Sequence, residues 1–408
     1  SSHHQVNSKT RQFPSEKQRV KISSMPTNFT EPMERKPYTP KLEFDGVSVQ
    51  MGYFDGFFSS IAQLSMSDLL GNHNISLMTD YVASQEVSND FNFAVSYEYY
   101  GNRPTYYASI FNWNQYFNND RTFLYGGRFV SGINRVQQRG LLTNASYPID
   151  LYRRLDFSYT YVGEQEELIW PLQEIGTTIS THLFKSAYVH DSITYGLLGP
   201  TVGQRYFLSA GRTLDTGISS RSFSHIEIDY RNYLRMGEWS VLGIRAYGVG
   251  SLGKDALNYN LGGPTWFLPF YTGFNLNTGP LRGFGFSEFN GSRVGLANIE
   301  LRVPFVRGIL FGWPTTFVIP AIDGSLFFDV GTAWNKGDRI DLWPLFNPDE
   351  NETPLEEEIH PRKPLYASVG FGLLTYFILP MNFEFARQTD LQGHYSNYHF
   401  HFSFGKSF

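Results

Sequence analysis

The sequence contains no cysteine and no long hydrophobic segment, and both absences narrow the class of protein. Without cysteine there is neither a disulfide framework nor a thiolate metal site. No stretch reaches the roughly 18 uncharged apolar residues that a membrane-spanning helix needs. A membrane protein without such helices must close its backbone hydrogen bonds in a β-barrel. The net charge of -5, with no long basic block, argues against a nucleic-acid partner.

The sequence is nevertheless rich in aromatic residues for a chain that is polar overall. Aromatic residues make up 17% of it, as 26 Tyr, 36 Phe and 7 Trp, while the mean hydropathy is only -0.30. A transmembrane barrel has this composition, because its lumen is polar and aromatic girdles lie at both membrane interfaces. The composition therefore favours an all-β membrane protein.

The pattern along the chain divides it into two parts. Residues 1–41 are polar and lack a periodic apolar pattern, and we interpret them as a linker or tail. From 42 to 408, segments of about ten residues alternate between apolar and polar, as membrane strands do. The expected strands, about sixteen in number, lie near 43–53, 57–68, 73–82, 90–100, 104–116, 122–148 (one strand or two), 151–162, 177–190, 203–213, 219–233, 238–250, 292–304, 321–335, 364–377, 380–388 and 395–408.

Alternation alone also fits a soluble sandwich with one wet face. The apolar faces here are dense in large aromatics, however, and no linker divides residues 42–408 into several sandwich domains. An even number of strands places both termini on the periplasmic side. The long loops 251–291 and 336–363 are then extracellular.

Charged residues on the inward faces of two strands suggest an ion-pair site in the lumen. The alternation turns Glu300 and Arg302 inward on one strand, and Asp323, Ser325 and Asp329 inward on the next. Two lumenal carboxylates on neighbouring strands need a cation. Arg282, in the loop 251–291, supplies it if the loop folds back into the barrel, because a guanidinium can pair with carboxylates in bidentate fashion.

Four motifs occur in order over the last third of the chain. They are LRGFGFSEFNGSRVGLANIELRVPF (281–305), GSLFFDVGTAW (324–334), LYASVGFGLL (365–374) and FHFSFGKSF (400–408). Together they resemble the BamA/TamA superfamily, also called the bacterial surface antigen family, of outer-membrane assembly and secretion barrels. Five expected strands follow the loop that carries the first motif, as in that family.

The resemblance implies a sixteen-stranded transmembrane antiparallel barrel in the outer membrane of a Gram-negative bacterium, with the extracellular loop folded into the lumen. Arg282 would contact Asp329 and Glu300. The residues of this lumenal latch would be Arg282, Gly283, Phe284, Glu300, Asp329 and Gly331. The first and last strands would meet at a seam, and the terminal strand would carry an assembly signal that includes Phe402, Phe404, Gly405 and Phe408.

Members that insert or secrete proteins carry periplasmic POTRA domains before the barrel, and the tail 1–41 is too short and polar to form one. Three functions therefore stay open: assembly, insertion or translocation of proteins; a membrane anchor or partner barrel for a soluble or surface domain; and a narrow passive pore. Expected partners are outer-membrane lipid and lipopolysaccharide, client outer-membrane proteins, and periplasmic or surface proteins.

No catalytic set converges, so we do not expect an enzyme. The pattern Gly405-Lys406-Ser407 lacks the earlier glycine of a phosphate-binding loop. His399 and His401 share the lumenal side of the terminal strand, where solvated lumen residues are a better interpretation than metal ligands. We expect neither a metal nor a cofactor.

Overall fold

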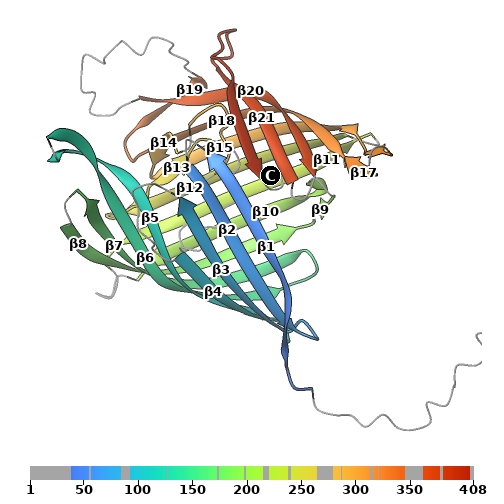
Figure 1. The fold of residues 1–408 in the computed structure, drawn as a ribbon, viewed down its shortest axis with the longest axis horizontal. Helices are drawn as coiled ribbons and strands as arrows, with labels where there is room; N and C mark the ends of the chain where they lie inside the picture. Colours follow the sequence, from blue (N-terminus) through green and yellow to red (C-terminus); the bar gives the residue numbers. More distant parts are fainter. Residues whose placement is uncertain are drawn as a thin grey trace, which may run out of the picture. The chain divides into compact units, whose positions relative to one another are not determined.

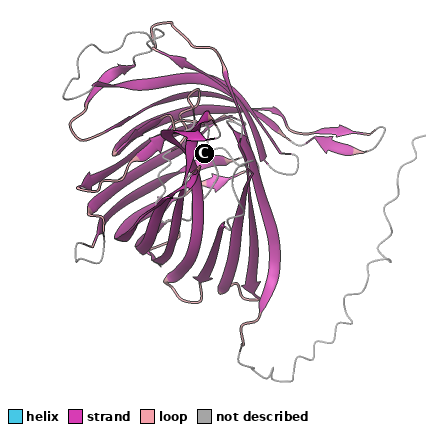
Figure 2. Cartoon of the chain, turned by 60° about the vertical axis from the view of Figure 1, so that its left-hand side comes forward, coloured by secondary structure: helices cyan, strands magenta, loops and turns pink. Residues whose placement is uncertain are grey.

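The computed structural model describes residues 38–54, 57–83, 92–125, 127–171, 174–196, 199–214, 220–237, 240–263, 279–285, 287–312, 316–319, 321–344, 362–376 and 380–404. The chain divides into two units, Ser1–Pro40 and Lys41–Phe408. The assignment of 1–41 as a tail stays a prediction, because residues 1–37 lie outside this description. In the second unit, the described residues form strands, turns and loops, with no helix among them (Figure 2).

Sixteen strands of the second unit pair antiparallel, each with the next along the wall (Figure 1). Short additional strands, β9 (Thr194–Tyr195) and β19 (Arg339–Pro344), complete the 18-stranded sheet. The sixteen are β1 (Leu42–Phe54), β2 (Phe57–Asp68), β3 (His73–Ala83), β4 (Asn92–Tyr99), β5 (Thr105–Tyr125), β6 (Arg128–Pro148), β7 (Arg153–Trp170), β8 (Glu174–Asp191), β10 (Pro200–Thr213), β11 (Phe223–Met236), β12 (Ser240–Gly253), β15 (Arg293–Val306), β18 (Ile322–Trp334), β20 (Arg362–Tyr376), β21 (Pro380–Thr389) and β22 (His399–Phe404).

The expected number and order of strands are confirmed, and the ambiguous region is settled. Residues 128–148 form the single strand β6, whereas 122–125 complete β5. Some expected boundaries were wrong: β7 runs on to Trp170 and β11 begins only at Phe223. The prediction of 151–162 placed Leu151 on a strand, but it lies in the turn before β7, beside the ion pair of Asp150 and Arg153.

The alternation of burial along the strands separates a lumenal face from an outward face. In β15, Val294, Leu296 and Asn298 are buried, whereas Ile299 is 43% exposed. Strand residues alternate between faces, so the large exposed side chains of the wall belong to the outward, lipid-facing surface. The interior contains both a polar network and an apolar cluster.

Two short hairpins lie outside the main sheet. Within the expected loop 251–291, β13 (Tyr259–Leu261) pairs with β14 (Phe289–Gly291). Between β15 and β18, β16 (Ile309–Phe311) pairs with β17 (Phe317–Ile319). The sequence alternation had not indicated either hairpin. In the described residues, no helix is long and apolar enough to cross a bilayer.

Candidate functional site: a loop latch in the barrel lumen

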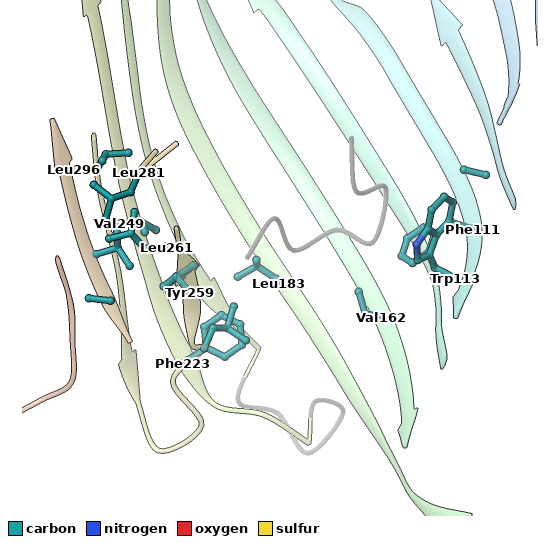
Figure 3. Packing of buried hydrophobic residues seen from close by; sticks show 14 of the residues in the cluster. Phe111, Trp113, Val162, Leu183, Phe223, Val249, Tyr259, Leu261, Leu281 and Leu296 are labelled. Carbon is teal, nitrogen blue, oxygen red and sulfur yellow. The ribbon is translucent and has the colours of Figure 1, made fainter. Parts of the chain in front are cut away.

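The described part of the long loop enters the lumen through a short stretch of backbone pairing. Gly263 and Leu281 form an isolated antiparallel bridge, with N–H···O distances of 3.2 and 3.1 Å. Leu281 is fully buried and belongs to an apolar cluster with Leu261, Val249 and Leu296 (Figure 3). Apolar packing on both sides of the bridge therefore positions the next residue, Arg282.

Arg282 makes the densest set of ionic hydrogen bonds among the described residues. Its Nε donates to Asp329 Oδ2 at 2.7 Å and its Nη2 donates to Asp329 Oδ1 at 2.8 Å, which is a bidentate pair. Its Nη1 donates to Glu300 Oε2 at 2.8 Å and to Glu384 Oε1 at 3.0 Å. The side chain is only 1% exposed. The guanidinium thus joins the loop to β15, β18 and β21.

Two further side chains fix the orientation of this pair. Asn298 donates to Asp329 Oδ1 at 2.8 Å and to the carbonyl of Pro280 at 2.9 Å, so it links the carboxylate to the loop backbone. The ring of Phe327 lies under the guanidinium, with Arg282 Cζ 3.5 Å from its centroid. A desolvated cation on an aromatic face is worth about 2 kcal/mol or more.

The ion-pair cluster contains more negative than positive charges. Three carboxylates, of Asp329, Glu300 and Glu384, face two guanidiniums, because Arg302 Nε also donates to Glu300 Oε1 at 2.7 Å. Burial by itself lowers the pKa of Arg282, but attraction from Asp329, Glu384 and Glu300 raises that pKa well above its usual value. Arg282 is therefore a permanent cation and holds the loop electrostatically.

Gly283 has little space around it and an unusual backbone. Its φ is +86°, and a Cβ there would lie 3.3 Å from the Cβ atoms of both Ala386 and Ser368. Its N–H donates to Nε2 of His401 at 3.2 Å, and its carbonyl accepts from Gln388 at 3.0 Å. Glycine lets the backbone make this left-handed turn against the wall. The loop tip thereby contacts the last strand, β22, directly.

Phe284 ends the latch in an aromatic cluster. Its ring meets those of Phe289 and Tyr366 edge-on, at centroid distances of 5.3 and 5.8 Å, and those two rings stack at 3.8 Å. Edge-to-face pairs add about 0.5–1.5 kcal/mol each beyond the burial of their surface. Phe284 is 4% exposed, so the cluster packs it against β14 of the same loop and attaches the loop to β20 of the wall.

A family comparison agrees with this architecture. The model of the Omp85 superfamily domain matches residues 72–408 of the chain. The chain belongs to the Omp85 superfamily. The resemblance to BamA-type barrels is thus confirmed, and the protein is an outer-membrane β-barrel of a Gram-negative bacterium. No curated protein matches the sequence.

Solved Omp85 barrels share the fold at low sequence identity. BamA from Haemophilus ducreyi, lacking POTRA domains 1–3, has a TM-score of 0.58 and 15% identity over 90% of this chain and 74% of its own. CdiB from Acinetobacter baumannii has a TM-score of 0.53 and 12% identity over 89% of this chain and 59% of its own. CdiB from Escherichia coli has a TM-score of 0.53 and 12% identity over 90% of this chain and 67% of its own. This family and fold are consistent with outer-membrane protein assembly or translocation.

The other expected site residues of this Omp85 barrel lie in two places. Gly331 has little space around it, since a Cβ there would lie 2.9 Å from the carbonyl oxygen of Gly295 on the neighbouring strand and 3.3 Å from the side chain of Leu261 in β13. Phe402 lies in β22 with its ring 4.9 Å from that of Phe383. Phe404 pairs through its backbone with Met381. Gly405 and Phe408 lie outside the described residues.

The sequence-based site lacked four lumenal contributors. Glu384 and Phe327 contact the guanidinium and Asn298 bonds Asp329, and all three lie on faces that alternation turns inward. Arg245 forms a second bidentate pair, with Asp229, at 3.0 Å for both bonds, and lies against the loop backbone at Gly279. Alternation marks such residues as lumenal, but it does not show which of them come together.

Glu384 is expected to be the most dispensable carboxylate of the latch. Glu384→Gln removes one negative charge from a cluster with an excess of them, and the amide oxygen can still accept from Arg282. We expect the free energy of unfolding to change by less than about 1 kcal/mol. Asp329→Asn is the matched control and should cost about 3–5 kcal/mol, because it breaks the bidentate pair.

Denaturant titration of the folded barrel in detergent, followed by tryptophan fluorescence, measures both variants. Equal decreases in the free energy of unfolding for Glu384→Gln and Asp329→Asn would show that the excess of negative charge does not determine which carboxylate is dispensable.

Proposed function

We propose that this barrel assists the assembly, insertion or translocation of proteins at the outer membrane, and that the seam between β1 and β22 is its working element. Cα atoms of the two strands come within 8 Å of each other. The observation that carries the proposal is the hydrogen bond from Gly283 to His401, because it couples the latched loop to the terminal strand. Movement of β22 then requires the loop tip to adjust.

Three further features support this proposal. Both neighbouring folds, BamA and CdiB, belong to the same superfamily of outer-membrane barrels. In the described part of β22, six residues pair with β21, whereas β1 pairs with β2 along most of its thirteen residues. The latch itself contains ion pairs that hold a loop, and we assign it no catalytic step. The partners would be client outer-membrane proteins and periplasmic proteins, in contact with lipid and lipopolysaccharide.

Depletion in the native host tests the proposed role. We expect quantitative proteomics of the outer membrane to show a broad fall in other barrels, with induction of envelope stress. Loss of only one or two proteins would instead indicate a partner-specific barrel or an anchor, and an unchanged outer membrane would contradict an assembly role.

A disulfide across the seam tests its mechanism, and the absence of native cysteine makes the experiment specific. Cysteine pairs that join β1 to β22 should abolish rescue of the depleted strain under oxidising conditions, and a reductant should restore it. The control is a pair at the facing positions Leu64 and Leu77 of β2 and β3, which stay together in the proposed cycle. Full activity of the locked seam would overturn this mechanism.

A further inference from the structure

The connection between β15 and β18, residues 307–321, is longer than the other periplasmic connections, of which the next longest spans 192–199. Residues 308–322 contain no charged side chain, although Arg307 and Asp323 flank them directly. Within this segment β16 and β17 pair Ile309 with Ile319, Leu310 with Val318 and Phe311 with Phe317. The hairpin forms its own two-stranded sheet, and both views show it projecting away from the wall (Figures 1 and 2).

The described side chains of this hairpin are exposed on both of its faces. Leu310 is 68% exposed, and its neighbours Ile309 and Phe311 are 38% and 37% exposed. Consecutive strand residues point to opposite faces, so neither face of the ribbon is polar at these positions. An isolated two-stranded hairpin is marginally stable at best in water. A ribbon of this composition therefore needs an apolar environment.

The outward face of β15 leads directly into the hairpin. Ile299 and Phe305 of that strand are 43% and 65% exposed toward lipid, and Ile309 follows four residues after Phe305. By strand parity the β15–β18 connection lies on the periplasmic side, next to the inner leaflet of the outer membrane. The lipid-facing surface of the barrel thus continues into the exposed apolar ribbon.

We infer that the β16–β17 hairpin inserts into the inner leaflet beside the barrel and that phospholipid acyl chains cover it. Two observations favour lipid over a protein partner. Protein interfaces have a polar rim, whereas the run 308–322 carries no charge at all. Arg307 directly precedes this run, and cationic side chains at the edge of an apolar segment pair with lipid phosphates.

Site-specific fluorescence in phospholipid vesicles tests this insertion on the whole protein. Leu310→Cys, labelled with a polarity-sensitive dye, should show blue-shifted emission and at least threefold stronger quenching by shallow spin-labelled phospholipid than the control. The control is Leu151→Cys, which places the dye in a periplasmic turn where Leu151 is 93% exposed and the ion pair of Asp150 and Arg153 is adjacent.

Thr316→Cys provides a second label on the hairpin, in case Leu310→Cys prevents folding. Heat-modifiable migration on gels selects the folded protein for either label. Emission and quenching equal to those of the control, at a position that folds, would overturn the inference. Protection of the dye by a co-purifying soluble protein, with no lipid quenching, would likewise overturn it and identify a protein-binding surface.

Discussion

Arg282→Ala is expected to destabilise the barrel by about 3–5 kcal/mol, since it removes the cation from three buried carboxylates. Asp329, Glu300 and Glu384 would be left at 5% side-chain exposure or less. The loop would lose its ionic contacts to β15, β18 and β21. Denaturant titration of the folded barrel measures the loss, and protease cleavage of the loop 251–291 should become faster.

Two comparisons separate the latch from a general effect of losing an arginine. Arg153→Ala removes an exposed partner of Asp150 and should leave stability unchanged, because exposed ion pairs contribute little. Arg282→Lys keeps the charge but cannot make the bidentate pair, so its free energy of unfolding should lie between those of the wild type and Arg282→Ala. Wild-type stability and protease resistance in Arg282→Ala would rule out the latch.

A variant that removes buried charges of the latch separates their effect on stability from their effect on function. Combining Arg282→Met with Asp329→Asn and Glu384→Gln removes the guanidinium and the charges of two of its three carboxylates, and it keeps Glu300 as the partner of Arg302 at 2.7 Å, so that neither guanidinium nor carboxylate is left as an uncompensated buried charge. We expect much of the stability to return without the loop attachment. Rescue of the depleted host by this variant would show that attachment of the loop is dispensable.

Phe284→Ala is also expected to lower the free energy of unfolding by about 3–5 kcal/mol, as for other buried phenylalanines. The substitution removes both edge-on ring contacts of Phe284 and leaves a cavity beside Phe289 and Tyr366. The matched control is Phe157→Ala, because Phe157 is 56% exposed on the lipid-facing surface. The free energy of unfolding should fall by clearly less in Phe157→Ala than in Phe284→Ala.

The two latch variants should also differ in what they release. Arg282→Ala frees the loop from the wall at β15, β18 and β21, whereas Phe284→Ala frees it from β20 and loosens its own packing against β14. If the free energy of unfolding falls equally for Phe284→Ala and Phe157→Ala, the aromatic cluster does not anchor the loop.

The strands and their faces followed from the sequence because side-chain alternation has a period of two and each strand buries one face. This rule predicted sixteen strands and the inward positions of Glu300 and Asp329. The strand boundaries that the rule predicted were wrong where strands such as β7 extend past the membrane-spanning length, since the alternation there lacks a dense apolar face. The hairpin β16–β17 was missed for a related reason, because apolar residues on both of its faces leave no alternation to detect.

The composition of the latch was decided by tertiary structure. Arg282 and Glu384 are 102 residues apart, and only the closing of the wall around the loop brings them within hydrogen-bond distance. The aromatic support from Phe327 and the contact between Gly283 and His401 likewise depend on how deeply the loop tip enters the lumen. Local alternation along each strand is enough to set which side chains face inward, and it can be read from the sequence. Which of them meet depended on strand register and loop position, which are set by long-range packing.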